Sequence, residues 1–200
     1  MERVLALSMR PKLLNDLVGQ TEIIDSLKSQ MNSGRIPHFF IISGPVGIGK
    51  TTLARILALS LQLQRKDFLL TDNDWLQYKK LEINEINAAN RNGIDEIRQI
   101  SNNLKYKPIF PSSAKIIILD EAHQLTNAAQ NALITETEDV AEYIYYIFCT
   151  STINKIIPAL RRRAYIITPK DLTESEIKEL LCQAKEYTQS PLEIDELLNI

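Results

Sequence analysis

Residues 37–57 read PHFFIISGPVGIGKTTLARIL, and this stretch decides the fold of the chain. Its first part, Pro37–Ser43, is a short run of aromatic and β-branched residues that ends at a glycine, which is typical of a buried β-strand. Beyond the glycines, apolar residues recur at the spacing of one helix face, at Leu53, Ile56, Leu57 and Leu61. The stretch therefore predicts a strand, a glycine loop and a helix, in that order.

The loop itself, GPVGIGKT at residues 44–51, matches the pattern GxxxxGK[ST] in full. Between a strand and a helix this pattern predicts a phosphate-binding P-loop, in which backbone N–H groups surround phosphate oxygens, Lys50 reaches the outer phosphates and Thr51 binds Mg²⁺. A chance glycine-rich turn is the alternative, and the flanking elements argue against it. The loop residues expected to bind ATP are Gly44, Pro45, Val46, Gly47, Ile48, Gly49, Lys50, Thr51 and Thr52.

Two carboxylates follow another predicted buried strand, Lys115–Leu119, which reads KIIIL. In an open α/β sheet the carboxyl ends of the strands face the ligand. Asp120 is therefore predicted to hold Mg²⁺, and Glu121 to orient and polarise the attacking water. An ordinary acidic turn is the alternative. The tetrapeptide DEAH at residues 120–123 also invites comparison with a helicase box, but 200 residues leave no room for the second motor domain of a helicase.

Further strands are predicted near residues 81–86, 144–149 and 164–167, with helical spacing between residues 94 and 104 and a helix starting near Thr126. This alternation of strands and helices predicts an α/β fold with a five-stranded parallel sheet covered on both faces.

A domain boundary is expected at Pro169–Asp171. Beyond it, Thr173 and Glu176 form a predicted capping box, and Ser190–Glu193 repeat the box with proline at the first helical position. We therefore expect a nucleotide-binding domain at residues 1–170 and the beginning of a helical lid domain at residues 171–200, cut short within a helical pattern.

Two features after the fourth predicted strand have open interpretations. Thr150 could place its hydroxyl near the terminal phosphate, or it could simply end the strand. Arg161–Arg163 could form a solvated surface, or one of these arginines could reach the ATP of a neighbouring subunit.

Composition limits the choice of partners. The chain has 44% hydrophobic residues, a formal net charge of -2 and two cysteines. No apolar run is long enough to cross a membrane, so no membrane partner is expected, and two isolated cysteines fit a reducing cytoplasm. Because the chain has no overall basic field, any contact with nucleic acid must be local.

Four regions of the sequence are similar to the clamp-loader ATPases. This AAA+ family includes the gamma/tau subunit of bacterial DNA polymerase III and the small subunits of replication factor C. The similar segments are RPKLLNDLVGQ at residues 10–20, SGRIPH at 33–38, EINAAN and GIDEIR at 85–90 and 93–98, and QLTNAAQNAL at 124–133.

The resemblance implies a P-loop NTPase of the AAA+ type with ATP and Mg²⁺ as cofactors. It implies that Arg10 and Val18 pack beside the adenine, that Thr150 occupies the family's sensor 1 position, and that Arg163 acts on ATP bound to a neighbouring subunit. The expected catalytic residues are then Lys50, Glu121, Thr150 and Arg163.

The resemblance also implies partners. They are the other clamp-loader subunits in a ring or spiral, a sliding clamp, and primer-template DNA held by its phosphate backbone. The positions that match the family's DNA contacts are Gly93–Ile94 and Thr126–Asn127, where simple helix capping is the alternative. In a bacterium the chain would belong to the nucleoid-associated replication machinery of the cytoplasm.

Three functions remain in competition. The first is an active clamp-loader ATPase. The second is another AAA+ machine, such as a helicase loader or a branch-migration motor, which would lack the segments at residues 85–98 and 124–133. The third is a non-hydrolysing structural subunit like the delta-prime component of the bacterial loader, which would have no reason to keep the magnesium ligands that are intact here.

Overall fold

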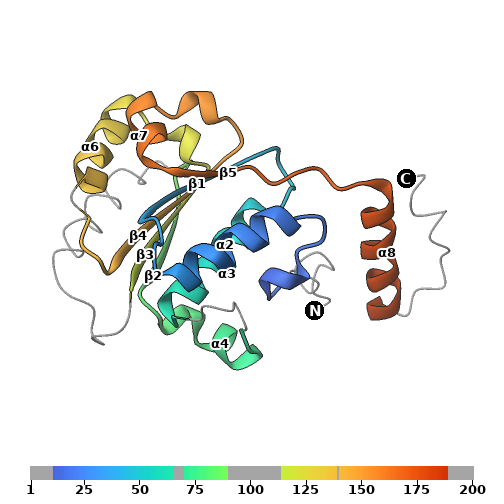
Figure 1. Cartoon of the computed structure of the whole chain (residues 1–200). Coiled ribbons are helices and arrows are strands. Elements are labelled where there is room, and N and C mark those ends of the chain that lie inside the picture. The colour runs from blue at the N-terminus through green and yellow to red at the C-terminus, as the bar shows by residue number, and fades with distance from the viewer. Residues whose placement is uncertain (1–10, 65–69, 90–113, 139, 189–200) are drawn as a thin grey trace.

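One parallel sheet forms the centre of the molecule. The computed structural model describes residues 11–64, 70–89, 114–138 and 140–188. Within these residues five parallel strands lie in the order β2-β3-β4-β1-β5 (Figure 1). They are β1 Phe39–Ser43, β2 Ile83–Asn87, β3 Lys115–Asp120, β4 Ile144–Thr150 and β5 Tyr165–Ile167. The prediction of a five-stranded parallel sheet is therefore confirmed.

Helices cover both faces of this sheet (Figure 1). On one face lie α2 (Thr21–Ser33) and α3 (Lys50–Gln62), with the short helix α4 (Asp72–Gln77) beyond them. On the other lie α6 (Asn127–Glu138) and α7 (Pro158–Arg163). The short 3-10 turns are η1 Leu14–Asp16, η2 Tyr78–Lys80, η3 Ala122–Gln124 and η4 Ile153–Lys155. No helix in the described part of the chain has the length and apolar character to span a bilayer.

The strand β3 shows why both faces need a cover. Ile116 and Ile118 pack into the core shared with α2 and α3, whereas Ile117 and Leu119 pack into the core shared with α6 and α7. All four side chains are at most 2% exposed. Each contributes roughly 1.5–3 kcal/mol by burial. A continuous apolar strand is stable only where helices shield it from water on both sides.

The helix α8 (Glu174–Thr188) follows an extended segment and stands apart from the sheet in Figure 1. The backbone N–H of Thr173 donates to Glu176 Oε2 at 2.7 Å, and the N–H of Glu176 donates to Thr173 Oγ1 at 3.4 Å. The capping box predicted here is confirmed. The second predicted box at residues 190–193 and the helical pattern at 94–104 lie outside the described residues.

A buried amide joins α6 to the loop that follows β4. Gln130 is 1% exposed, and its Nε2 donates to the carbonyls of Leu125 at 3.2 Å and Lys155 at 3.0 Å. Its Oε1 accepts from the N–H of Ile157 at 2.8 Å. One side chain therefore satisfies three backbone groups of two separate loops.

We expect Gln130→Leu to lower the free energy of unfolding by about 3 kcal/mol, because the buried backbone groups lose their partner while the side-chain volume is nearly kept. Urea unfolding measures this loss. The exposed Gln183→Leu in α8 serves as the control and should change stability by no more than about 0.5 kcal/mol. Equal stability of the two variants would contradict the role given to Gln130.

Candidate nucleotide and metal site

The loop of residues 44–49 leaves β1 and leads directly into α3. Gly47 and Gly49 have φ of 88° and 93°, a region that L side chains rarely adopt, and a Cβ on either would meet no atom within 4 Å. The glycines are thus required by the backbone path and leave the space beside it open. The first backbone bond into α3 runs from Leu53 to the carbonyl of Gly49, so the N–H groups of residues 50–52 have no partner within the helix.

Lys50 is the first residue of α3 and lies against the loop. Its side chain is buried, and Nζ donates to the carbonyl of Pro45 at 2.7 Å. In contrast, Val46 at the tip of the loop is 81% exposed. The positive charge is therefore held over the loop, at the positively polarised end of a 13-residue helix, an arrangement that favours an anion.

The acidic side of the site comes from β3. Thr51 Oγ1 donates to Asp120 Oδ2 at 3.0 Å, which joins the start of α3 to the end of a strand 69 residues later. Asp120 Oδ1 accepts from the backbone N–H of Glu121 at 3.0 Å. The neighbouring strand β2 pairs with β3 up to Asp120, and the N–H of Ala88, directly after β2, donates to the Asp120 carbonyl at 2.9 Å. A hydroxyl beside a carboxylate is the oxygen donor set that suits Mg²⁺, with phosphate oxygens and water completing the coordination.

Both charges of the site act on Cys149, a buried residue of β4. Burial raises the pKa of its thiol, the negative charge of Asp120 raises it further, and the ammonium of Lys50 acts in the opposite direction. The thiol therefore stays protonated at neutral pH. Asp120 and Lys50 are therefore both near enough to this end of β4 to act on the thiol.

Glu121 adopts an uncommon backbone conformation directly after Asp120. Its φ of 52° and ψ of 39° are left-handed, which is unfavourable by roughly 1–2 kcal/mol for a residue with a Cβ. The carbonyl of Glu121 accepts from the N–H of Gln124 at 2.8 Å, and this bond closes the turn η3. The carboxylate is 35% exposed, so the turn presents an accessible acid beside a half-buried one.

Thr150 ends β4, between β3 and β1 in the sheet. It is fully buried, and its Oγ1 accepts from the N–H of Thr152 at 3.1 Å. Its carbonyl accepts from the N–H of Gly44 at 3.2 Å, at the start of the glycine loop. The hydroxyl thus has a structural task in the turn after β4, and the backbone of the same residue holds the loop.

Of the two residues predicted to pack beside the adenine, the structure describes one. Arg10 lies outside the described residues, and Val18 is half-buried. Next to it, Gly19 has φ of 75°, and a Cβ there would lie 2.7 Å from Leu172 Cδ2. The amide of Gln20 binds Lys170 twice, through Nε2 to the carbonyl at 2.8 Å and through Oε1 to the N–H at 3.0 Å. Residues 18–20 are thereby joined to the segment that enters α8.

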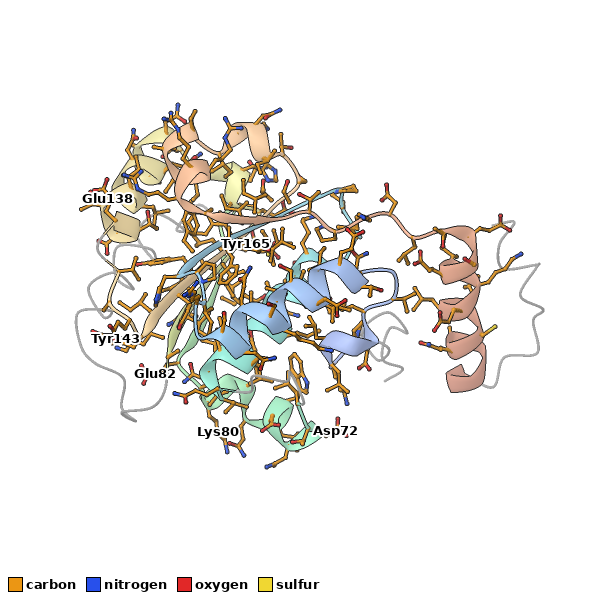
Figure 2. All side chains as sticks on the ribbon, viewed as in Figure 1. Asp72, Lys80, Glu82, Glu138, Tyr143 and Tyr165 are labelled. Atoms are coloured by element: carbon orange, nitrogen blue, oxygen red, sulfur yellow. The ribbon has the colours of Figure 1, made fainter. Side chains whose placement is uncertain are left out.

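The arginine run lies on α7, away from the glycine loop (Figure 1). Arg163 pairs with Glu138 at the end of α6, labelled in Figure 2, and also donates to the carbonyl of Ala159 at 3.1 Å. Arg161 donates to Asn154 Oδ1 at 3.5 Å, and Arg162 is exposed.

Two positions were compared with the DNA contacts of the clamp-loader ATPases. Thr126 caps α6 by accepting from the N–H of Ala129 at 3.2 Å, and Gly93–Ile94 lie outside the described residues.

Comparison with known proteins gives the family. Residues 19–173, well over half of the chain, match the family model described as DNA polymerase III, delta subunit. The chain belongs to this family. A replication factor C small subunit from Picrophilus torridus is 36% identical over 94% of this chain and 55% of that protein. A DNA polymerase III subunit gamma from Buchnera aphidicola is 30% identical over 90% of this chain and 51% of that protein.

These relatives confirm the resemblance to clamp-loader AAA+ proteins, and this member of the delta-subunit family spans about half of their length. Among solved structures, the RuvB Holliday junction branch migration motor of Thermotoga maritima has a TM-score of 0.67 at 22% identity, covering 93% of this chain and 57% of that chain. A DNA polymerase III gamma subunit-related protein of the same organism has a TM-score of 0.53 at 19% identity, covering 80% and 49%. At such identities the likeness shows the fold, a P-loop NTPase.

Proposed function

We propose that this chain is the ATP-binding and ATP-hydrolysing subunit of a DNA sliding-clamp loader, which uses ATP to open the clamp and load it on primer-template DNA. The observation that carries the proposal is the hydrogen bond between Thr51 and Asp120 in a member of a clamp-loader family. A hydroxyl and a carboxylate so placed, beside a lysine at the head of α3, are the parts that a magnesium-dependent phosphoryl transfer requires.

Each residue has a distinct task in this proposal. The free N–H groups at residues 50–52 and the loop of residues 44–49 hold the phosphates, and Lys50 exchanges its bond to Pro45 for the outer phosphates. Thr51 and Asp120 hold the metal, which when bound neutralises the charge of the phosphates. Glu121 accepts a proton from the attacking water and orients it.

The remaining predicted residues surround this centre. Arg10 and Val18 flank the adenine, and Thr150 contributes its hydroxyl near the terminal phosphate. Residues 1–170 form the nucleotide domain, and α8 begins a lid domain. The two hydrogen bonds of Gln20 with Lys170 lie within the nucleotide domain so defined, at its last residue. A Cβ on Gly19 would lie 2.7 Å from Leu172 Cδ2, so the adenine segment lies against the beginning of the lid domain.

Arg163 acts on the ATP of a neighbouring subunit in this proposal. We expect Arg163→Ala to lower hydrolysis by the assembled loader roughly 10³-fold, while the variant chain alone binds ATP as the wild type does. Steady-state hydrolysis in the complex and calorimetry on the single chain measure the two effects. The exposed Arg162→Ala is the control. Unchanged hydrolysis by the complex containing Arg163→Ala would show that Arg163 does not act on the ATP of a neighbouring subunit.

The clamp-loader role is tested by capture from solution. The full-length protein is mixed with a sliding clamp, its partner subunits and primer-template DNA, with and without MgATP. We expect the clamp to be retained only with MgATP and to be lost with Lys50→Ala, whereas Lys155→Ala, an exposed lysine of η4, retains it. Retention of a replicative helicase instead of the clamp would favour another AAA+ machine.

The same assembly distinguishes the active subunit from a structural one. If the complete loader turned over ATP at the same rate with wild type and with Glu121→Gln, the chain would be a non-hydrolysing component. The family model is named for a delta subunit and several relatives for gamma subunits, so the family name alone does not decide between these roles.

A further inference from the structure

His123 is a nearly buried side chain that the proposed mechanism has not used. It lies in η3, two residues after Glu121, and its side chain is 9% exposed. Its Nδ1 lies 3.3 Å from Glu121 Oε2 and is buried without a hydrogen bond. A buried ring nitrogen without a partner is unfavourable, and a carboxylate at this separation needs only a change of direction to supply one.

The other ring nitrogen faces two groups on the opposite side. Nε2 lies 3.1 Å from Gln124 Nε2 and 3.5 Å from Ser151 Oγ. An amide nitrogen is only a donor, so the contact with Gln124 requires His123 Nε2 to accept. In the neutral ring the proton then resides on Nδ1, the atom that faces Glu121.

The position of Ser151 shows which two strands the imidazole connects. Ser151 follows Thr150, the last residue of β4, whereas Glu121 follows the last residue of β3. The imidazole therefore lies between the turns that leave two neighbouring strands. The turn that carries His123 is anchored on both sides by Ala122, which is fully buried, and Leu125, which is 6% exposed.

We propose that His123 is a positioning residue for Glu121, and this inference rests on the proposed ATP hydrolysis. Its Nδ1–H holds Oε2 of the Glu121 carboxylate and leaves Oε1 for the attacking water. Its Nε2 takes its orientation from Gln124 and from the turn at Ser151, so a shift of that turn moves the catalytic carboxylate. His123 itself touches neither water nor phosphate in this role.

The test compares two amide substitutions. His123→Asn keeps an N–H donor near the place of Nδ1, whereas His123→Gln places its donor near Nε2 and leaves Glu121 without one. We expect single-turnover hydrolysis of MgATP to fall roughly 10-fold to 100-fold in His123→Ala and His123→Gln and to be largely restored in His123→Asn. The Kd for ATP should stay within about twofold of the wild-type value in all three. His38→Ala, which changes the only other histidine, should keep the wild-type rate.

A purely structural histidine would give a different pattern. Rates that follow the thermal stability of the variants, with Asn and Gln equally impaired, would overturn the proposal, as would a wild-type rate in a folded His123→Ala. An ATP affinity that falls together with the rate would also overturn it. If the wild-type chain, alone and with its partner subunits, hydrolysed no ATP, the proposed function would fail and this inference with it.

Discussion

Lys50→Ala is expected to weaken ATP binding by about 100-fold or more. The remaining affinity of the variant for ATP is then too weak for an ordinary calorimetric titration. The ammonium lies at the head of α3, bonded to the carbonyl of Pro45. No other residue of the stretch GPVGIGKT at residues 44–51 has a positive side chain. Bonds from a charged group are worth about 1.5–3 kcal/mol each, and Lys50 should make more than one to the outer phosphates.

Lys155→Ala provides the matched control, since it removes an exposed lysine from the turn η4. Titration of both variants and of the wild type with MgATP should separate Lys50→Ala from the other two. If Lys50→Ala bound ATP as tightly as the wild type, the assignment of the glycine loop as the phosphate site would be wrong.

Glu121→Gln should behave in the opposite way. We expect ATP affinity to stay within about twofold of the wild-type value, while turnover falls roughly 10²-fold to 10⁴-fold, because glutamine keeps the shape of the side chain but cannot accept the proton of the water. Asp120, which faces Thr51, is unchanged in this variant, so the metal site is preserved. Single-turnover hydrolysis and calorimetry measure the two quantities.

The control for Glu121→Gln is Glu142→Gln, which neutralises an exposed carboxylate before β4 and should leave turnover unchanged. An equal loss of turnover in both variants would mean that the effect comes from net charge and not from the position of Glu121. A loss of ATP affinity in Glu121→Gln would instead indicate that this carboxylate helps to hold the metal.

The strands were predictable because their apolar runs are bounded by clear signals. Pro37 and Gly44 bracket β1, and Lys115 and Asp120 bound β3, so the observed bounds differ from those predicted by one or two residues. The capping box at Thr173 was predictable for the same reason, since it depends only on residues three apart. Patterns of this kind are predictable because the residues that cause the element are neighbours in the sequence.

The strand order was not predictable from such patterns. The position of β4 between β3 and β1 depends on which faces of distant helices pack together, and apolar periodicity is the same for every order. The order matters for the site, because it places Thr150 beside both Ser43 and the end of β3.

Four arrangements were also hidden from the sequence. The left-handed backbone of Glu121 depends on the turn η3, and nothing in its residue type indicates a positive φ. The contacts of Gln130 and the pair of Arg163 with Glu138 join separate elements. His123 was visible as part of the DEAH tetrapeptide, but only its burial between Glu121 and Ser151 distinguishes it from a surface histidine.

A crystal structure of the chain with Mn²⁺ and a non-hydrolysable ATP analogue tests the nucleotide and metal site most directly, because the anomalous signal of manganese locates the metal. We expect one manganese bonded to Thr51 Oγ1 on the side that faces Asp120, with the outer phosphates between Lys50 and the N–H groups of residues 50–52. Manganese bound elsewhere, or phosphates outside the loop of residues 44–51, would contradict this assignment of the site.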